Sequence, residues 1–84
     1  MYLVYVLRSE KDGRFYVGMT NDIIRRLKEH NAGKSKSTKG FTPWILVFTE
    51  TLPSREEARK REKYLKSGVG KEYIKDYWSR SSAG

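Results

Sequence analysis

A carboxylate on the apolar side of a predicted helix is the most informative chemical feature of the sequence. Residues 54–67 have a helical pattern, and on a helical wheel Glu62 falls on the same stripe as Ala58 and Leu65. A carboxylate that faces inward loses hydration unless it is paired or binds a metal ion. Glu62 is therefore a candidate metal ligand, although an ordinary ion pair with Lys66, one turn later, would also explain it.

Arg26 and His30 form a second pair of side chains suited to chemistry. Ile23, Ile24 and Leu27 share one face of another predicted helix, and Arg26 and His30 lie on the border of that face. The planar guanidinium of an arginine can bind a phosphate through two hydrogen bonds. The alternatives are a surface arginine in a basic helix and a capping or half-buried histidine near the helix end.

The charge balance narrows the choice of partner. Lys and Arg total 18 against 10 acidic residues, a formal net charge of +8, which attracts polyanions. Nucleic acid is preferred over a membrane, because no helix sets a broad Trp/Phe/Leu face against a lysine face. A basic protein without a special partner, or one that docks on an acidic protein, remains an alternative.

Cysteine and histidine usage excludes several kinds of site. The sequence has no cysteine, which excludes disulfides, cysteine-bound zinc and thiol nucleophiles, and its single histidine excludes a multi-histidine metal site. The apolar run at residues 2–7 is too short for a signal peptide or a membrane span. We therefore expect a cytoplasmic protein.

Periodicity and turn residues predict the elements that would position these side chains. An antiparallel hairpin is expected from residues 2–7 and 14–19 around Asp12-Gly13, and a third strand from residues 43–50. Helices are expected from about residue 23 to Gly33, from Ser54 to about Ser67 with Gly68 as its stop, and from residues 71 to 80. Residues 33–40 are expected to form a mobile loop, and residues 81–84 a disordered tail. The prediction is an α/β (α+β) fold in one domain over residues 1–80.

Four motifs in order resemble the signature of the GIY-YIG nucleases. They are Leu3-Val4-Tyr5, Tyr16-Val17-Gly18, Arg26 in one helix and Glu62 in the next. The two tyrosines are 16 − 5 = 11 residues apart, as a two-stranded hairpin requires. The resemblance covers nearly the whole chain, is closest to the small stand-alone members, and implies a small three-stranded antiparallel sheet flanked by about three helices.

The resemblance also implies a site and a reaction. Glu62 would bind one divalent cation, Mg²⁺ or Mn²⁺, and Arg26 would hold the scissile phosphate. Tyr5 and Tyr16 would line the site, with Tyr5 nearer to the attacking water, and His30 matches an active-site histidine of several members. The implied function is a metal-dependent endonuclease that hydrolyses phosphodiester bonds in DNA and serves DNA repair. The alternative is a non-catalytic nucleic-acid-binding module with the same fold.

Two departures and one structural residue complete the comparison. Leu3 replaces the glycine of the first motif, and the asparagine found downstream in many members has no counterpart. Gly18 would allow a close approach of backbone or substrate, or pack against the first helix.

Basic side chains are expected to bind the substrate, with DNA favoured over RNA. Such binding would be salt-sensitive and largely independent of sequence. A protein partner or dimerisation cannot be deduced from the sequence. The candidate nucleic-acid-binding residues are Arg25, Lys28, Lys34, Lys36, Lys39, Arg59 and Lys63.

Overall fold

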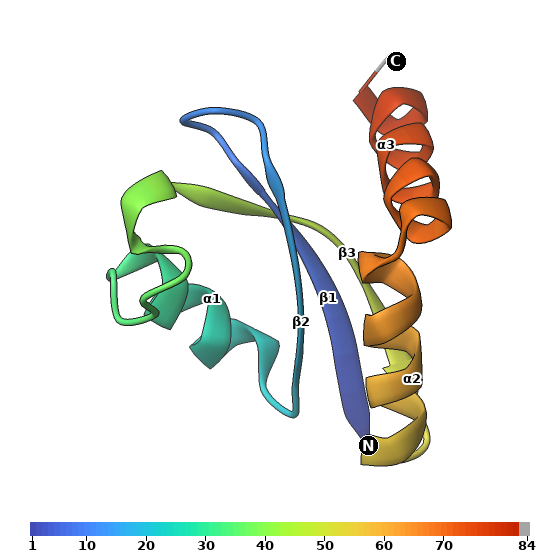
Figure 1. Ribbon diagram of the computed structural model, residues 1–84. Helices are drawn as coiled ribbons and strands as arrows, with labels where there is room; N and C mark the ends of the chain where they lie inside the picture. Colours follow the sequence, from blue (N-terminus) through green and yellow to red (C-terminus); the bar gives the residue numbers. More distant parts are fainter. Residues whose placement is uncertain (83–84) are drawn as a thin grey trace.

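The computed structural model describes residues 1–82 and contains one sheet with helices on both sides (Figure 1). The elements follow one another as β1 (Tyr2–Ser9), β2 (Phe15–Thr20), α1 (Ile23–Asn31), the 3-10 helix η1 (Lys39–Phe41), β3 (Trp44–Leu52), α2 (Arg55–Lys66) and α3 (Gly68–Ser82). No helix among the described residues is long and apolar enough to cross a membrane.

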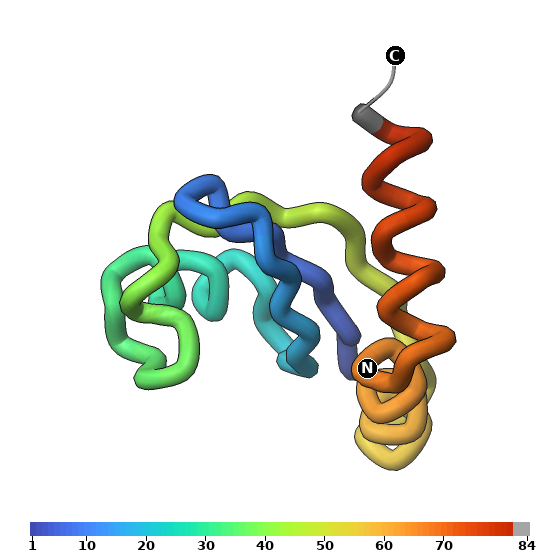
Figure 2. Tube along the Cα trace, turned by 45° about the horizontal axis from the view of Figure 1, so that its top comes forward, coloured from blue at the N-terminus to red at the C-terminus, as the bar shows by residue number. Residues whose placement is uncertain are grey.

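The strands form an antiparallel sheet in the order β2-β1-β3. The continuously apolar β1 lies in the middle, because both of its faces are covered. Side chains alternate along a strand, so Val4 and Val6 face α2 and α3 while Tyr5 and Leu7 face α1. Figure 2 shows α1 and the following loop on one side of the sheet, and α2 and α3 on the other. The predicted three-stranded antiparallel sheet with three flanking helices is confirmed.

The two faces bury different clusters. Toward α2 and α3, Val4, Val6, Val17, Ala58, Leu65 and Ile74 form an apolar core. Toward α1, the buried residues are Tyr5, Leu7 and Trp44, packed against Tyr16, Ile23, Leu27 and Phe41.

Capping residues fix the start of α1 and of α2. The Asp22 side chain accepts a hydrogen bond from the backbone N–H of Arg25, and the Ser54 side chain accepts one from Glu57. Within α1, Ile23 contributes to the core as predicted, but Ile24 is 69% exposed. The assignment of Ile24 to the buried face was wrong, because the packed stripe of this short helix runs through Ile23, Leu27 and His30 instead.

Three predicted boundaries also need correction. Helix α2 ends at Lys66, close to the predicted end, but Gly68 begins α3, which was expected only from residue 71. The Ser67 hydroxyl accepts a hydrogen bond from the Gly70 N–H in the first turn of α3. Helix α3 includes Ser81 and Ser82, which were assigned to the tail, and residues 83–84 lie outside the described residues. The segment of residues 33–40 is not simply a solvated loop, since it enters η1 and buries Thr38 completely.

Candidate active site

Tyr5 and Gly18 face each other across the β1–β2 pair and define the floor of the candidate site. They are direct partners in the strand register. A Cβ atom placed on Gly18 would overlap the Tyr5 ring and its hydroxyl group. The absent side chain of Gly18 therefore makes room for Tyr5, which lies only 1% exposed in this space. Neither α1 nor an open approach for substrate accounts for this glycine.

A chain of three buried polar side chains leads away from the Tyr5 hydroxyl. The Tyr5 oxygen lies 2.9 Å from His30 Nε2, and His30 Nδ1 lies 2.7 Å from Thr38 Oγ1. The Thr38 hydroxyl donates to the Ser35 carbonyl at 3.5 Å, so it accepts from His30 Nδ1–H. This hydrogen-bond pattern assigns the tautomer in which Nε2 carries the lone pair and accepts the Tyr5 proton.

Trp44 anchors the far end of this chain. Its indole Nε1–H donates to the Thr38 carbonyl at 2.9 Å, and its backbone N–H donates to the Asn31 side chain at 2.6 Å. The loop after α1 is thereby tied both to the helix and to β3. His30 and Thr38 are fully buried and hydrogen-bonded, so the predicted border position of His30 is an interior one.

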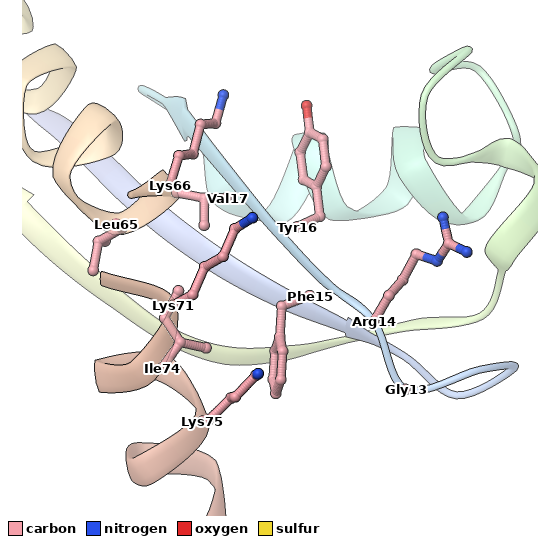
Figure 3. A pocket seen from close by; sticks show the side chains of 10 residues that line it. All are labelled: Gly13, Arg14, Phe15, Tyr16, Val17, Leu65, Lys66, Lys71, Ile74 and Lys75. Carbon is pink, nitrogen blue, oxygen red and sulfur yellow. The ribbon is translucent and has the colours of Figure 1, made fainter. Parts of the chain in front are cut away.

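Tyr16 stands beside the chain and is the more accessible of the two tyrosines. Its ring packs edge-on against His30 with centroids 5.1 Å apart, and lies 6.3 Å from the Tyr5 ring. Tyr16 is half-buried, and its hydroxyl points away from the side of β2 that carries Phe15 (Figure 3). Between the two phenols, Tyr16 is therefore the one that a bound molecule could touch without rearrangement.

Burial and the Arg26 charge set the protonation states. Burial raises the pKa of the Tyr5 phenol, and the interaction with the Arg26 guanidinium only partly offsets this. Burial also lowers the pKa of His30, and the positive charge of Arg26 lowers it further. At neutral pH the pair therefore consists of a protonated phenol and a neutral imidazole.

Arg26 reaches the site from α1 and is held by Glu29. Their side chains form an ion pair at 3.0 Å and are 32% and 33% exposed. Burial disfavours the charged guanidinium, but hydrogen bonding to Glu29 and Tyr5 outweighs it and raises the pKa of Arg26. Arg26 is thus a permanent cation, partly open to solvent and aimed at the tyrosines.

Glu62 belongs to α2, on the opposite side of the sheet from α1. Its negative charge is close enough to Tyr5 to contribute to the raised pKa of that phenol. The Glu62 side chain is 17% exposed and lies 3.4 Å from the ammonium group of Lys66, so the ion pair considered for it does form. No group of three or more His, Asp or Glu side chains within residues 1–82 is arranged to hold a metal ion.

The structure thus brings together Tyr5, Tyr16, Arg26 and His30, with Gly18 paired to Tyr5, whereas Glu62 on α2 is linked to them through the effect of its charge on Tyr5. It does not gather the candidate nucleic-acid-binding cations into one patch: all seven are exposed, but those of α1 and its loop and those of α2 flank opposite faces of the sheet. They are Arg25, Lys28, Lys34, Lys36, Lys39, Arg59 and Lys63.

Sequence reasoning missed two residues that hold the site together. Glu29 is three positions after Arg26, a spacing that predicts an ion pair on a helix. Thr38 gave no such signal, because it lies among small polar residues typical of a solvated loop.

Comparison with known proteins agrees with the geometry. The model of the GIY-YIG catalytic domain matches residues 1–76. The chain belongs to the GIY-YIG family. The resemblance deduced from the motifs is thereby confirmed.

Similar GIY-YIG proteins are small. A UPF0213 protein of Halobacterium salinarum is 46% identical over 67 residues, which are 79% of this chain and 86% of that protein. A UPF0213 protein of Halalkalibacterium halodurans is 46% identical over 66 residues, 77% of this chain and 69% of that one. The solution NMR structure of a UPF0213 protein from Bacillus halodurans is 41% identical, with a TM-score of 0.55, and the match covers 90% of this chain and 84% of that chain.

Membership in the GIY-YIG family indicates a nuclease fold whose members in general act on nucleic acid with a divalent metal ion. The names of the similar proteins carry no activity. The reaction, the ion and the role of each residue in this chain are therefore matters for proposal.

Proposed function

We propose that this GIY-YIG protein is a metal-dependent endonuclease that hydrolyses phosphodiester bonds in DNA. The observation that carries the proposal is that the Arg26 guanidinium and the Tyr16 ring lie against a buried hydrogen-bonded pair, Tyr5 and His30, and that the Glu62 charge is near enough to act on the Tyr5 phenol. Phosphoryl transfer needs a cation that binds the phosphate, a carboxylate that can hold a metal ion, and a group that positions the attacking water. The proposed compartment is the cytoplasm, and the proposed process is DNA repair.

The surroundings of Glu62 fit one hard divalent cation. The carboxylate is mostly shielded, yet its ion-pair contact with Lys66 is long at 3.4 Å, so its oxygens are not fully engaged. Mg²⁺ retains several waters and needs only one or two carboxylates together with phosphate oxygens. Glu62 would hold Mg²⁺ or Mn²⁺, and the ion would supply electrostatic stabilisation of the charge on the phosphate.

Arg26 is the residue proposed to bind the scissile phosphate. Its guanidinium is partly exposed and already oriented by Glu29. Because it stays protonated, it offers hydrogen bonds to the non-bridging oxygens throughout the reaction. Holding the phosphate in one orientation and balancing its growing charge are the two effects expected from such an arginine.

The two tyrosines take different parts in this proposal. Tyr16 is accessible, so it touches the attacking water or the phosphate through its hydroxyl. Tyr5 is 1% exposed and acts as a positioning residue, because its hydrogen bond fixes His30, against which the Tyr16 ring packs. This assignment reverses the expectation that Tyr5 lies nearer to the water.

His30 is proposed to keep this floor neutral and rigid. A protonated His30 would place a buried positive charge beside Arg26, and burial and the Arg26 charge accordingly lower the pKa of His30. With Nδ1–H fixed by Thr38, the imidazole presents only an acceptor toward Tyr5. Tyr5 therefore has one favoured orientation.

A non-catalytic nucleic-acid-binding module is the second candidate. The observation in its favour is the Glu62–Lys66 ion pair, which occupies the carboxylate proposed for the metal. In that case Mg²⁺ would not bind at Glu62, and bound DNA would remain uncut with or without Mg²⁺.

Cleavage of supercoiled, single-stranded and branched DNA, and of RNA, at low salt with Mg²⁺ or Mn²⁺ tests the proposal. Wild type, Glu62→Gln and Glu57→Gln are compared. Glu57 is the matched control, since it lies on the same helix and forms its own lysine ion pair, with Lys60 at 3.6 Å. We expect wild type and Glu57→Gln to cut DNA, and Glu62→Gln to be at least about 100-fold slower.

A calorimetric titration with Mn²⁺ in the absence of DNA separates the two candidates. Binding that disappears in Glu62→Gln and persists in Glu57→Gln supports the metal site. Equal cutting by all three proteins would contradict the assigned site, and binding of DNA without any cutting would favour the module.

A further inference from the structure

A groove runs along the outer edge of β2, beyond the candidate active site. β2 is an edge strand, because within residues 1–82 it pairs with β1 alone. Between this edge and the junction of α2 with α3 lies a hollow of about 420 Å³. That volume lies within the range of about 300–1,000 Å³ that is usual for ligand sites. Figure 3 shows the strand on one side of the hollow and the two helices on the other.

The floor of this β2-edge groove is apolar. It consists of Phe15 and Val17 from β2, Leu65 from α2 and Ile74 from α3. Phe15 is only half-buried, and one edge of its ring meets Trp78 with centroids 6.5 Å apart. A half-buried aromatic ring at the floor of a groove is a surface on which a flat, partly apolar ring can stack.

The rim of the groove is cationic. Lys66, Lys71 and Lys75 follow one another along the helices and extend toward β2, with Arg14 at the far end (Figure 3). No acidic residue is among the ten that line it within the described chain. Lys66, Lys75 and Arg14 have carboxylate partners outside the lining, namely Glu62, Glu72 and Asp12.

The groove and the candidate active site share two residues. Tyr16 lines the groove and also packs against His30. Lys66 lines the groove and also contacts Glu62. A molecule that lies along the groove therefore comes next to the Lys66–Glu62 ion pair, while the Tyr16 phenol points away from the Phe15 floor (Figure 3).

We propose that the β2-edge groove binds an unpaired segment of the nucleic acid next to the scissile phosphate, with a base on the Phe15 floor and phosphates at the lysine rim. This inference rests on the proposed function, since it identifies the substrate of the same site as one with single-stranded character. An apolar floor below a cationic rim matches a base attached to a phosphate. A duplex hides the faces of its bases and offers mainly its backbone.

The ion pair of Lys66 connects the groove to the proposed metal site. A divalent ion at Glu62 would compete with the Lys66 ammonium for the same carboxylate. Once released, Lys66 lies at the rim, where a phosphate can replace the carboxylate as its partner.

Fluorescence anisotropy in EDTA tests the groove without requiring cleavage. A labelled single-stranded oligonucleotide and a duplex of the same length are titrated with wild type, Lys71→Gln, Lys75→Gln and Phe15→Leu. Lys60→Gln is the matched control: Lys60 and Lys75 are 76% and 65% exposed, each has a glutamate partner three residues before it, and only Lys75 lines the groove.

We expect Lys71→Gln and Lys75→Gln each to weaken single-strand binding several-fold and to reduce the magnitude of the salt slope by roughly 0.7, the value for one phosphate contact. Lys60→Gln should have a smaller effect on both. Phe15→Leu should weaken binding of the single strand about five- to tenfold and leave the duplex nearly unchanged. Circular dichroism verifies that each variant is folded.

Three results would overturn the inference. The first is equal weakening by Lys60→Gln and Lys75→Gln, which would show that net charge alone matters. The second is an equal response of the duplex to Phe15→Leu, and the third is displacement of the oligonucleotide by polyglutamate as effectively as by unlabelled DNA. Groove binding without metal-dependent cutting would retain this inference and reject the nuclease, whereas cutting with no groove effect would do the opposite.

Discussion

Adjacent residues of β1 supply two faces of opposite chemistry. Val4 and Val6 are fully buried in an apolar core beneath α2 and α3. Tyr5, between them, points toward α1 and begins a hydrogen-bonded chain through His30 to Thr38. Both faces exclude water, but the titratable side chains that are almost fully buried within residues 1–82, Tyr5 and His30, lie on the α1 face.

The difference shows where stability and chemistry reside in this small chain. Apolar burial contributes in proportion to area and tolerates moderate changes of shape. A buried polar chain contributes little net free energy when complete, and costs much when one partner is removed. The α1 face therefore limits how the tyrosines and His30 can vary, while the core of the α2/α3 face keeps the sheet folded beneath Glu62 and the β2-edge groove.

The largest expected effect is chemical and lies on the α1 face. Tyr16→Phe removes an accessible hydroxyl that has no hydrogen-bond partner within residues 1–82. We expect cleavage to fall about 100-fold or more, with the free energy of unfolding changed by less than about 0.5 kcal/mol. The measurements are single-turnover cleavage and urea denaturation, with the 38% exposed Tyr77 changed to Phe as the control. Unchanged cleavage by Tyr16→Phe would remove this residue from the proposed site.

On the other face of the sheet, a change at Val6 should lower stability and leave cleavage unchanged. Val6→Ala deletes two buried methyl groups from the core, which should lower the free energy of unfolding by about 2–3 kcal/mol. Cleavage per folded molecule should stay at the wild-type value, because Val6 lies on the face away from Tyr5 and its contacts are with apolar side chains. Val69→Ala is the control, since Val69 is 67% exposed. A strong loss of cleavage in fully folded Val6→Ala would show that the two faces are not separable.

Local sequence patterns were sufficient to predict most of the framework. The apolar run of β1, the hairpin turn and the capping residues Asp22 and Ser54 all act within a few residues, and the structure has each of them. The inward stripe of α2 also placed Glu62 correctly, since its side chain is only 17% exposed. Patterns of this kind depend on strand and helix period alone.

The contact between Gly18 and the Tyr5 ring could be found only from the three-dimensional structure. The sequence indicates a close approach at Gly18, but not that the approaching group is the ring of Tyr5. The same limit applies to Gly68, where a glycine typical of a helix end instead begins α3. In both cases a neighbouring element in space decides the role of the residue.

Thr38 illustrates the limit most clearly. Its burial depends on Trp44, whose indole N–H reaches the Thr38 carbonyl, and on His30, which needs a partner for Nδ1. Neither contact is local, and a segment rich in Lys, Ser and Gly predicts a solvated loop. Tertiary contacts with α1 and β3 determine the conformation of this segment.

Thr38→Val sharpens the comparison by removing one polar partner and keeping the shape. His30 Nδ1–H would lose its acceptor inside the protein, so the free energy of unfolding should fall by about 1–2 kcal/mol. Thr51→Val is the control, since Thr51 is exposed on β3. The His30 ring resonances should also report a mixture of tautomers in the Thr38 variant. If Thr38→Val changed neither the free energy of unfolding nor the His30 resonances, the hydrogen bond from His30 to Thr38 would not be what sets the tautomer.

The smallest predicted effect is a pH dependence that only the α1 face should have. The pKa of His30 is lowered in the folded protein, by burial first and then by Arg26, so between that pKa and about 6.5 the unfolded chain binds more protons. The stability contributed by neutral His30 is therefore complete above about pH 6.5, and it falls as the pH decreases toward the folded pKa. The slope cannot exceed about 1.4 kcal/mol per pH unit for one proton.

Urea denaturation of wild type and His30→Gln from pH 8 to pH 5 measures this effect as a difference, in which carboxylates common to both proteins largely cancel. We expect wild type to lose stability relative to His30→Gln as the pH falls below about 6.5, because glutamine has no proton to take up. Val6→Ala, whose change lies on the apolar face, should keep the pH profile of the wild type with a constant offset. A pH-independent difference between wild type and His30→Gln would mean that His30 is protonated as readily in the folded protein as in the unfolded chain. The neutral imidazole beneath Tyr5 and Tyr16 would then no longer distinguish this face from the other.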